Sequence, residues 1–292
     1  MERQSLDAVV RHALAEDLCE DFQGEFNALL AGERSHFADV TSDALFTDEE
    51  ADAWVHAKSE GVLSGSKAFY RVFDIVDSSL SVTFSIRDGQ HFTVGDRVAS
   101  LHGRIHSILV GERTALNFLG HLSGIATRVR ELTELLNSSH IRILDTRKTL
   151  PGLRSVEKEA VVHGGGMNHR MGLFDMVLIK DNHIDRAGSI TQAVQAVRNR
   201  HGSRYSIEVE SRTLAEVEEA VQAGVDRIML DNMDVATMEE AASLIKGRAE
   251  IEVSGNIDRH NLESMRSLPI DFISIGSITY AAGHADFSLT VQ

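Results

Sequence analysis

The chain has 292 residues, of which 42% are hydrophobic, and this apolar content is ordinary for a folded protein with a buried core. Its formal charge of −15 argues against nucleic acid and anionic membranes as partners, because both bind cationic surfaces. The single cysteine, Cys19, excludes an internal disulfide framework and is typical of a reducing compartment.

The N-terminal segment gives no sign of membrane targeting. No apolar run approaches the ~20 residues that span a bilayer. The start of the chain, MERQSLDAVVRHALAEDL, is amphipathic and acidic and lacks the apolar core of a signal peptide. We therefore expect a cytoplasmic protein. At about 150 residues per domain, the length allows one large domain or two modest ones.

The first third of the chain has the pattern of an α+β domain. Residues 5–18 are predicted to form a helix. Runs that alternate apolar and polar residues like strands follow at 51–59, 80–89 and 91–103. The last segment, 286–292, alternates in the same way. We expect it to return to this antiparallel sheet as one more strand.

A long helical pattern over 112–136 leads into a region where strands and helices alternate. Short runs rich in β-branched residues predict strands at 141–146, 175–180, 205–210, 226–230, 249–254 and 271–276. Helical patterns between or after them cover 189–202, 213–224, 234–247 and 258–268. Thr213 and Gly224 are the expected N-cap and C-cap of the second helix. This alternation calls for a parallel sheet, and six such units favour a closed or nearly closed α/β barrel.

The middle of the chain reverses the overall charge. Basic residues and histidines gather there, namely Arg142, Arg147, Lys148, Arg154, Lys158, Arg170, Lys180, Arg186, His163, His169 and His183. A cationic pocket in an acidic protein favours a small anionic ligand over a polyanion. An ordinary charged surface would instead scatter such residues over both ends of the strands.

Chemically distinctive residues end or follow every predicted strand, where a parallel barrel forms one rim. They are Thr146, Arg147, Lys148, Lys180, Glu210, Asp231, Ser254, Gly255, Asn256, Ile275, Gly276 and Ser277. The cations match carboxylate or phosphate oxygens, and the acids suit sugar hydroxyls or a hard cation such as Mg²⁺. The small residues let backbone N–H groups approach a phosphate. The expected ligand is therefore part anion, part sugar and part phosphate.

The residues that carry this pattern also carry a family resemblance. The segment DTRKTLPGLRSVEKEAVVHGGGMNHRMGLFDMVLIKDNHI, 145–184, resembles the core of the quinolinate phosphoribosyltransferases. The resemblance continues, in the family's order, through GVLSG (61–65), ERTALNFLGHLSGIATRV (112–129), IEVE (207–210), MLDNM (229–233), EVSGNI (252–257) and SIGSIT (274–279). It implies an N-terminal α/β sandwich domain, residues 1–112 with the tail 280–292, joined to an incomplete α/β barrel, residues 113–279, as in type II phosphoribosyltransferases.

The resemblance implies a glycosyltransferase of the pentosyltransferase class, acting in NAD biosynthesis. It would join quinolinate to 5-phosphoribosyl-1-pyrophosphate and release nicotinate mononucleotide, pyrophosphate and CO₂. The implied quinolinate ligands are Arg147, Arg170 and an Arg113 from the partner subunit of a homodimer, or of a larger oligomer, with His169 and Lys180 beside them. The implied catalytic residues are Lys148, Lys180, Glu210 and Asp231, the two acids holding ribose hydroxyls and Mg²⁺. Ser254, Gly255 and Gly276 would cradle the 5′-phosphate.

Three departures from the family pattern stand out. Asn256 occupies a position where the family often has a second glycine, Ser277 replaces a commoner alanine, and residues 20–37 are longer than typical. Other functions also stay open: a paralogue associated with molybdenum uptake, a Schiff-base aldolase that uses Lys180, and a non-catalytic phosphosugar-binding protein.

Overall fold

The structure is a computed structural model that describes residues 2–19, 27–29 and 39–292. Most of the unusually long segment 20–37 therefore lies outside the described residues. The chain forms two compact units. The first comprises Met1–Arg128, Leu150–Gly165 and Ala281–Gln292, and the second comprises Val129–Thr149 and Gly166–Tyr280. The expected boundary between residues 112 and 113 falls inside one continuous helix, α5 (Ile105–Leu136).

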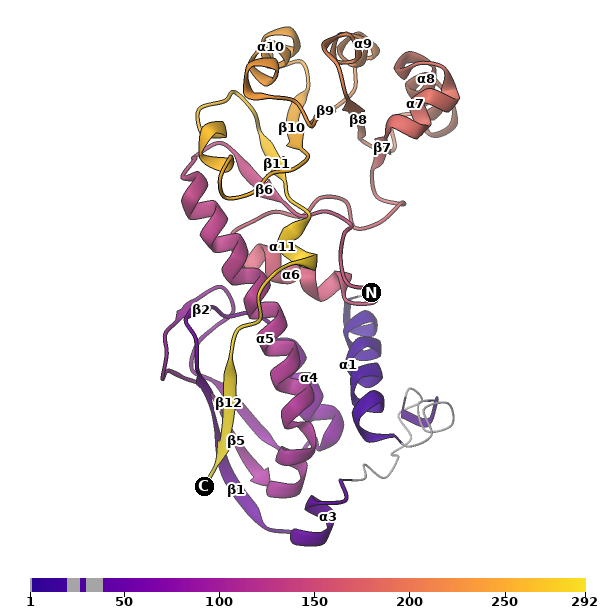
Figure 1. The fold of residues 1–292 in the computed structure, drawn as a ribbon. Helices are drawn as coiled ribbons and strands as arrows, with labels where there is room; N and C mark the ends of the chain where they lie inside the picture. The colour runs from indigo at the N-terminus through magenta and orange to yellow at the C-terminus, as the bar shows by residue number, and fades with distance from the viewer. Residues whose placement is uncertain (1, 20–26, 30–38) are drawn as a thin grey trace. The chain divides into compact units, whose positions relative to one another are not determined.

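The first unit is built around an antiparallel sheet with strand order β12-β1-β5-β3 (Figure 1). Its strands are β1 (Glu50–Ala57), β3 (Ser81–Phe84), β5 (Arg97–Arg104) and β12 (Phe287–Val291), and a separate pair is formed by β2 (Gly61–Val62) and β4 (His91–Phe92). Its helices are α1 (Glu2–Leu18), α3 (Ser42–Leu45), α4 (Ser66–Val76), the first part of α5, and α6 (Arg154–His163).

The C-terminal strand returns to this sheet as predicted. β12 pairs antiparallel with β1, with Ala53 opposite Val291 and Ala57 opposite Phe287. The segment before β12 crosses α5 closely, and the N–H of Ala285 donates to the carbonyl of Gly120 at 3.0 Å. A Cβ at Gly124 would lie 1.8 Å from the carbonyl oxygen of Gly283, so glycine is needed where the two segments cross.

Helix α4 is absent from the sequence prediction, because its segment SKAFYRVFDIV is rich in the aromatic and β-branched residues that favour strands. Its buried residues follow helical spacing instead: Ala68, Phe69, Val72 and Phe73 face the core. The rings of Phe69 and Phe73 lie 5.1 Å apart, and Phe69 also meets Phe84 of β3 at 5.3 Å. Packing between helix and sheet therefore decides the conformation of this segment.

The second unit is a parallel sheet of six strands in the order β6-β11-β10-β9-β8-β7. Its elements are β6 (Arg142–Leu144), β7 (Val177–Ile179), α7 (Asp181–Ala187), α8 (Ile190–His201), β8 (Ile207–Ser211), α9 (Leu214–Ala223), β9 (Arg227–Asp231), α10 (Val235–Ile245), β10 (Glu250–Ser254), the 3₁₀ helix η1 (Leu262–Met265), β11 (Phe272–Ser274) and α11 (Ser277–Tyr280). The strand order ends at β6 on one side and at β7 on the other, so the barrel is open there.

The helices α7 to α10 lie on the outer side of the strands (Figure 1), and their starts follow capping rules. Ser189, Thr213 and Asp234 each accept a hydrogen bond from a backbone N–H in the first turn of α8, α9 and α10. Gly224 ends α9 in the left-handed conformation, as predicted. Helices on one face and hydrogen-bonded neighbours along the sheet explain why these strands are rich in apolar residues.

The predicted helix over 258–268 is wrong in extent. Only Leu262–Met265 is helical, as the short 3₁₀ helix η1. The side chains of Asp258 and Asn261 hydrogen-bond backbone N–H groups within this segment, at 2.8 Å from His260 to Asp258 and 3.0 Å from Asp258 to Asn261. Such local bonds offer the backbone an alternative to an α-helix.

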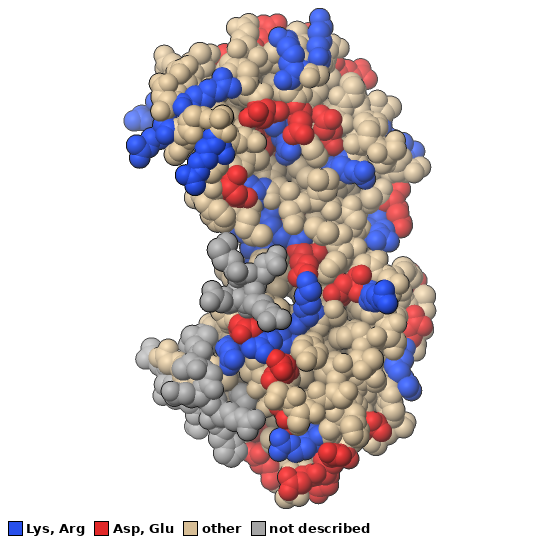
Figure 2. All heavy atoms as spheres, turned by 180° about the vertical axis from the view of Figure 1, so that it is seen from behind, with Lys and Arg blue, Asp and Glu red and all other residues tan. Residues whose placement is uncertain are grey.

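Charge is mixed over the molecular surface. Figure 2 shows basic and acidic side chains interspersed over the face it draws, and neither sign covers that face alone. Within the described part of the chain, no helix is both long enough and apolar enough to cross a bilayer.

Candidate active site

A cavity of about 720 Å³ opens at the carboxyl ends of the strands of the second unit. Every predicted site residue except Arg113 lines it: Thr146, Arg147, Lys148, His169, Arg170, Lys180, Glu210, Asp231, Ser254, Gly255, Asn256, Ile275, Gly276 and Ser277. Parallel strands bring their carboxyl ends to one edge, which is why residues so far apart in sequence meet here.

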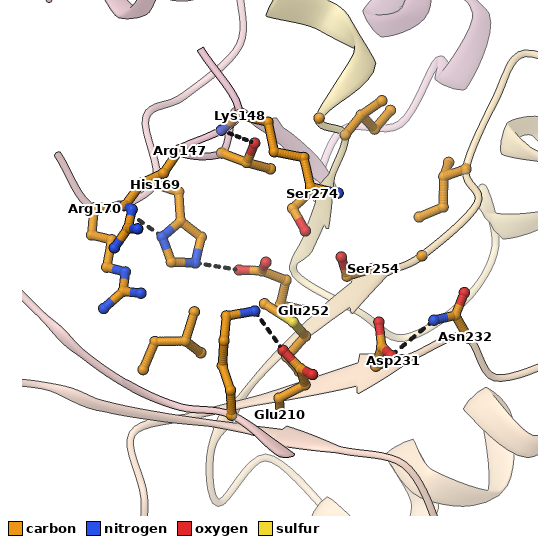
Figure 3. A pocket seen from close by; sticks show the side chains of 18 of the residues that line it. Arg147, Lys148, His169, Arg170, Glu210, Asp231, Asn232, Glu252, Ser254 and Ser274 are labelled. Carbon is orange, nitrogen blue, oxygen red and sulfur yellow. Dashed lines mark hydrogen bonds and ion pairs between the residues drawn. The ribbon is translucent and has the colours of Figure 1, made fainter. Parts of the chain in front are cut away.

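Arginines gather at one side of the cavity. Figure 3 shows Arg147 and Arg170 near one another, with His169 beside them. Burial, together with the neighbouring Arg147 cation, lowers the pKa of the Arg170 guanidinium. The Arg170 Nη1 donates only a long bond, 3.4 Å, to the carbonyl of Met176. Two neighbouring guanidinium groups of the same charge favour the binding of an anion between them.

Lys180 and Glu210 form an ion pair across neighbouring strand ends. The Lys180 Nζ lies 2.7 Å from the Glu210 Oε2. Lys180 directly follows β7, and Glu210 belongs to β8. Behind them, the backbone N–H of Lys180 donates to the Nδ1 of His183 at 2.9 Å. His183 therefore caps α7, and it also lines the cavity.

The opposite side of the cavity carries a chain of amides and a carboxylate (Figure 3). Asn256 Nδ2 donates to Asn232 Oδ1 at 3.0 Å, and Asn232 Nδ2 donates to Asp231 Oδ2 at 2.8 Å. Ser254 stands opposite Asp231 in the β9–β10 register. A Cβ at Gly255 would lie 2.3 Å from Asn232 Oδ1, and Gly255 has φ +99°, so only glycine fits there.

Lys148 lies over the loop that follows β11. The backbone N–H of Lys148 donates to Thr146 Oγ1 at 3.0 Å, and Thr279 Oγ1 donates to the Lys148 carbonyl at 2.7 Å. A Cβ at Gly276 would lie 2.8 Å from Lys148 Cδ. Glycine at 276 therefore leaves room for the lysine side chain against the backbone.

Two buried acids, Glu208 and Glu252, approach His169, and Glu252 also lines the cavity. Both have 0% relative exposure, and their Oε2 atoms lie 3.0 Å and 3.5 Å from His169 Nε2. Burial raises the pKa of both carboxyls well above the ordinary glutamate value, and for Glu252 the neighbouring Glu208 charge adds to the rise. The pair therefore retains a proton at a pH where an exposed glutamate has lost it.

Sequence reasoning missed Glu208, Glu252 and Asn232. The sequence contained a signal for the two acids, because residues i and i+2 of a strand face the same side of the sheet. Glu208 lies two residues before Glu210, and Glu252 two residues before Ser254. For Asn232 the signal was weak: its left-handed backbone, with φ 53°, shows only in the structure.

Part of the predicted cationic cluster does not reach the cavity. Arg142, Arg154, Lys158, His163 and Arg186 are not among its lining residues. Arg142 begins β6, at the end of the strand that lies away from the cavity, and Arg154, Lys158 and His163 belong to α6 of the first unit. Closeness in sequence was misleading because the chain leaves the barrel between Thr149 and Gly166. Arg113 is exposed on α5.

Comparison with known proteins agrees with this architecture. The family model described as the quinolinate phosphoribosyl transferase C-terminal domain matches residues 125–290, and the N-terminal domain model matches residues 39–123. A Bacillus subtilis protein named probable nicotinate-nucleotide pyrophosphorylase [carboxylating] is 40% identical over 253 residues, covering 87% of this chain and 88% of the relative. A Nicotiana tabacum quinolinate phosphoribosyltransferase [decarboxylating] 1b is 38% identical over 291 residues, covering 93% of this chain and 83% of the relative.

A solved structure extends the likeness to three dimensions. The nicotinate-nucleotide pyrophosphorylase from Francisella tularensis superposes with a TM-score of 0.90 at 36% identity, covering 100% of this chain and 98% of that one. Two family models in order, relatives above 30% identity along most of the chain, and this superposition all agree. The chain belongs to the quinolinate phosphoribosyltransferase family.

Proposed function

We propose that this chain transfers the phosphoribosyl group of 5-phosphoribosyl-1-pyrophosphate to quinolinate, with release of pyrophosphate and CO₂ and formation of nicotinate mononucleotide. The observation that carries the proposal is the division of one cavity into a cationic side and a side of carboxylate, amide and hydroxyl groups. A pyridine dicarboxylate fits the first side, and an activated sugar phosphate fits the second.

Quinolinate is assigned to the side of Arg147 and Arg170. Each guanidinium offers a planar fork of N–H donors that matches a carboxylate, and quinolinate has two carboxylates. Lys180 adds a point charge from the end of β7, and Thr146 and His169 lie beside the arginines. Bringing two anions together costs energy in water, so much of the rate is expected to come from this positioning.

The phosphoribosyl donor is assigned to the other side. Ser254, Gly255 and Asn256 follow β10, and Ile275, Gly276 and Ser277 follow β11, so backbone N–H groups and hydroxyls surround one small region. Such groups suit the 5′-phosphate. Lys148, close to Gly276, and Lys180 are assigned to the donor's pyrophosphate.

The carboxylates of Glu210 and Asp231 are assigned to the sugar. When the bond between C1 and the pyrophosphate oxygen breaks, positive charge develops on the ribose ring, and nearby carboxylates stabilise it. Glu210 pairs with the Lys180 ammonium group, and Asp231 is oriented by Asn232. Loss of CO₂ then leaves an electron pair on the pyridine C2, which takes up a proton.

The same two residues fit a magnesium requirement. Carboxylate oxygens are the ligands that Mg²⁺ prefers, and it commonly bridges one or two carboxylates and substrate phosphates. Glu210 and Asp231 line the cavity at the ends of β8 and β9. When bound with the donor, the ion neutralises charge on the departing pyrophosphate.

We also assign the active form to a homodimer in which Arg113 of one subunit completes the partner's site. Arg113 is exposed on α5 and does not line the cavity of its own subunit. An exposed arginine on a long, well-packed helix is well placed to enter a neighbouring molecule. The family resemblance supplies the remaining support for this assignment.

The Schiff-base alternative fits the cavity less well. A lysine that attacks a carbonyl must be uncharged, and desolvation or a neighbouring cation achieves this. Lys180 instead has a carboxylate at 2.7 Å, and 45% of its side chain is exposed. Neither feature is the desolvated or cationic setting that activates a lysine for this attack. Borohydride treatment with carbonyl substrates should therefore leave Lys180 unmodified.

The function is tested by supplying quinolinate, the phosphoribosyl donor and Mg²⁺ and following CO₂ and nicotinate mononucleotide together. Equal amounts of both products are expected, with little turnover when nicotinate replaces quinolinate, because nicotinate lacks the second carboxylate. Tight donor binding without pyrophosphate release would instead identify a phosphosugar-binding protein.

A further inference from the structure

His169 lies between the anion-binding arginines and the buried acid pair, and its contacts restrict what its ring can do. Its backbone N–H donates to Asp145 Oδ1 at 2.8 Å, and its Nδ1 accepts the backbone N–H of Arg170 at 2.7 Å. Its Nε2 lies 3.0 Å from Glu208 Oε2, a close charge contact without hydrogen-bond geometry, and only 6% of the side chain is exposed. The residue is therefore held from three directions.

These contacts define the tautomer of the imidazole. A nitrogen that accepts a hydrogen bond carries no proton, so the single proton of the neutral ring lies on Nε2. Nε2 faces the carboxyls of Glu208 and Glu252. The ring thus has no further N–H for a substrate carboxylate.

The acid pair is itself anchored from the strands below. Arg227 Nη1 lies 3.2 Å from Glu252 Oε2, its Nη2 lies 2.9 Å from Glu250 Oε2, and its guanidinium stacks on Phe272 at 4.1 Å. Glu208 stands opposite Arg227 in the β8–β9 register. The remaining charges near the pair are Arg170 and Lys180, and the hydroxyl of Ser274 lies beside Glu252.

The side chain of Arg170 is weakly held by its own contacts. Its guanidinium shares the cavity with Arg147, and the two cations repel one another until an anion binds. Among the residues that the structure describes, the Arg170 guanidinium makes one hydrogen bond, the long one to the carbonyl of Met176. A precise guanidinium position therefore depends on how firmly its backbone is held.

We propose that Glu208 and Glu252 are positioning residues that act through His169, holding its imidazole so that Nδ1 fixes the backbone of Arg170, and that His169 does not itself bind quinolinate. Asp145 fixes the other side of the same segment through the His169 backbone. The buried acids thus serve the anion site without touching the anion. The kinetic part of the test rests on the proposed function, whereas the spectroscopic part does not.

The first test compares His169→Asn with His169→Gln. The terminal oxygen of asparagine takes the place of Nδ1 and can still accept the Arg170 N–H, whereas the longer glutamine reaches the place of Nε2. We expect the KM for quinolinate to rise by about 10-fold or more in His169→Gln and distinctly less in His169→Asn, with the KM for the donor within about twofold in both. The reverse order would show that Nε2 contacts the substrate and would overturn the proposal.

The second test addresses the acids. Glu208→Gln keeps a polar group of the same size beside Nε2, and Glu208→Leu removes it, so quinolinate KM is expected to rise about 10-fold in the leucine variant and to recover in the glutamine variant. The control is Glu157→Gln, which alters another fully buried glutamate paired with a histidine, His121, in the first unit. That control is expected to lower stability and leave the quinolinate KM unchanged.

The tautomer provides a readout that does not depend on turnover or on the leucine variant folding. In protein labelled with ¹⁵N-histidine, the His169 signals, identified by their loss in His169→Asn, should show a bare Nδ1 and a protonated Nε2 in the parent. Glu208→Leu, if folded, should mix the two tautomers. A proton on Nδ1 in the parent, or a quinolinate KM and tautomer unchanged by Glu208→Leu, would refute the positioning role.

Discussion

At the scale of single residues, Arg147 is the group on which anion binding most depends. It shares the cavity with Arg170, and burial together with the Arg147 charge already lowers the Arg170 pKa. Removing one partner of a desolvated charge contact costs several kcal/mol, so Arg147→Ala should reduce kcat/KM for quinolinate by about 100-fold or more. Steady-state kinetics would measure this.

A matched control for Arg147 is available at the start of β6, the strand that precedes it. Arg142 begins β6 and does not line the cavity, so Arg142→Ala should leave kcat/KM for quinolinate near the parent value. Activity within about threefold of the parent in Arg147→Ala would show that this arginine is peripheral to the anion.

Asn256 is the residue at which this chain departs from the family glycine. It has φ 49°, a left-handed conformation that asparagine tolerates, so the loop geometry survives the departure. Its amide adds a contact that glycine cannot make, to Asn232 and through it to Asp231. The hydrogen-bond chain was visible only in the structure.

Asn256→Gly should therefore raise the KM for the phosphoribosyl donor by about threefold to 10-fold and leave the KM for quinolinate unchanged, because one neutral hydrogen bond is lost on the donor side only. Asn137 also has a left-handed backbone, with φ 44°, and lies outside the cavity. Asn137→Gly controls for the backbone effect. An equal change in both KM values of Asn256→Gly would contradict this role.

At the scale of elements, the first unit depends on a buried carboxylate where α4, β5 and α5 meet. Asp77 ends α4 and accepts hydrogen bonds from Arg104, at the end of β5, and from Ser107, at the start of α5, at 2.7 Å and 2.8 Å. Burial by itself raises the pKa of Asp77, but the hydrogen bonds from Ser79, Ser107 and Arg104 outweigh it and lower the pKa to about 2.

The sign of this shift determines the pH dependence. The folded pKa lies below the ordinary value of 3.8, so the carboxylate stabilises the fold above that pH, and the contribution is lost as the pH falls through about 2. Asp77→Asn should lower the free energy of unfolding by about 2 kcal/mol near neutral pH. Urea denaturation should show this difference narrowing as the pH approaches about 3.

Exposed acids provide the comparison for Asp77. Glu60 is exposed, so Glu60→Gln should change the free energy of unfolding little at any pH in this range. A constant difference between the parent and Asp77→Asn from neutral to acidic pH would mean that the ionised carboxylate contributes nothing beyond its shape.

Elements differed in how readily the sequence predicts them. The parallel strands and the helices α8 to α10 follow from apolar runs and from capping residues such as Thr213 and Gly224, because those signals are local. Helix α4 was missed because its residues favour strands, and packing of Phe69 and Phe73 overrides that preference. For the segment 258–268 the sequence predicted too much helix. Hydrogen bonds from the backbone to the side chains of Asp258 and Asn261 replace the helical ones there.

At the scale of the whole molecule, the shared-site dimer makes a prediction that a self-contained subunit does not. An Arg113→Ala subunit keeps its own Lys180, and a Lys180→Ala subunit keeps its Arg113. Each variant alone should be inactive, but a mixed dimer contains one intact site. Random exchange makes about half of the dimers mixed, so mixing should restore about a quarter of the parent activity.

A second mixture tests the geometry of this result. Arg147 and Lys180 line the same cavity of one subunit, so mixing Arg147→Ala with Lys180→Ala should restore nothing. Recovery in the second mixture, or none in the first despite verified subunit exchange, would place Arg113 outside the partner's site.

The sequence by itself determined the alternation of strands and helices, the parallel barrel, the return of the C-terminal strand, and most residues of the cavity rim. These follow from local patterns, because the ends of parallel strands meet at one edge whatever the details of packing. Only the tertiary structure decided which cations reach that rim, since α6 carries Arg154 and Lys158 into the other unit. It also decided that Glu208 and Glu252 lie buried against His169, because contacts between side chains on different strands depend on register and burial that no single segment encodes.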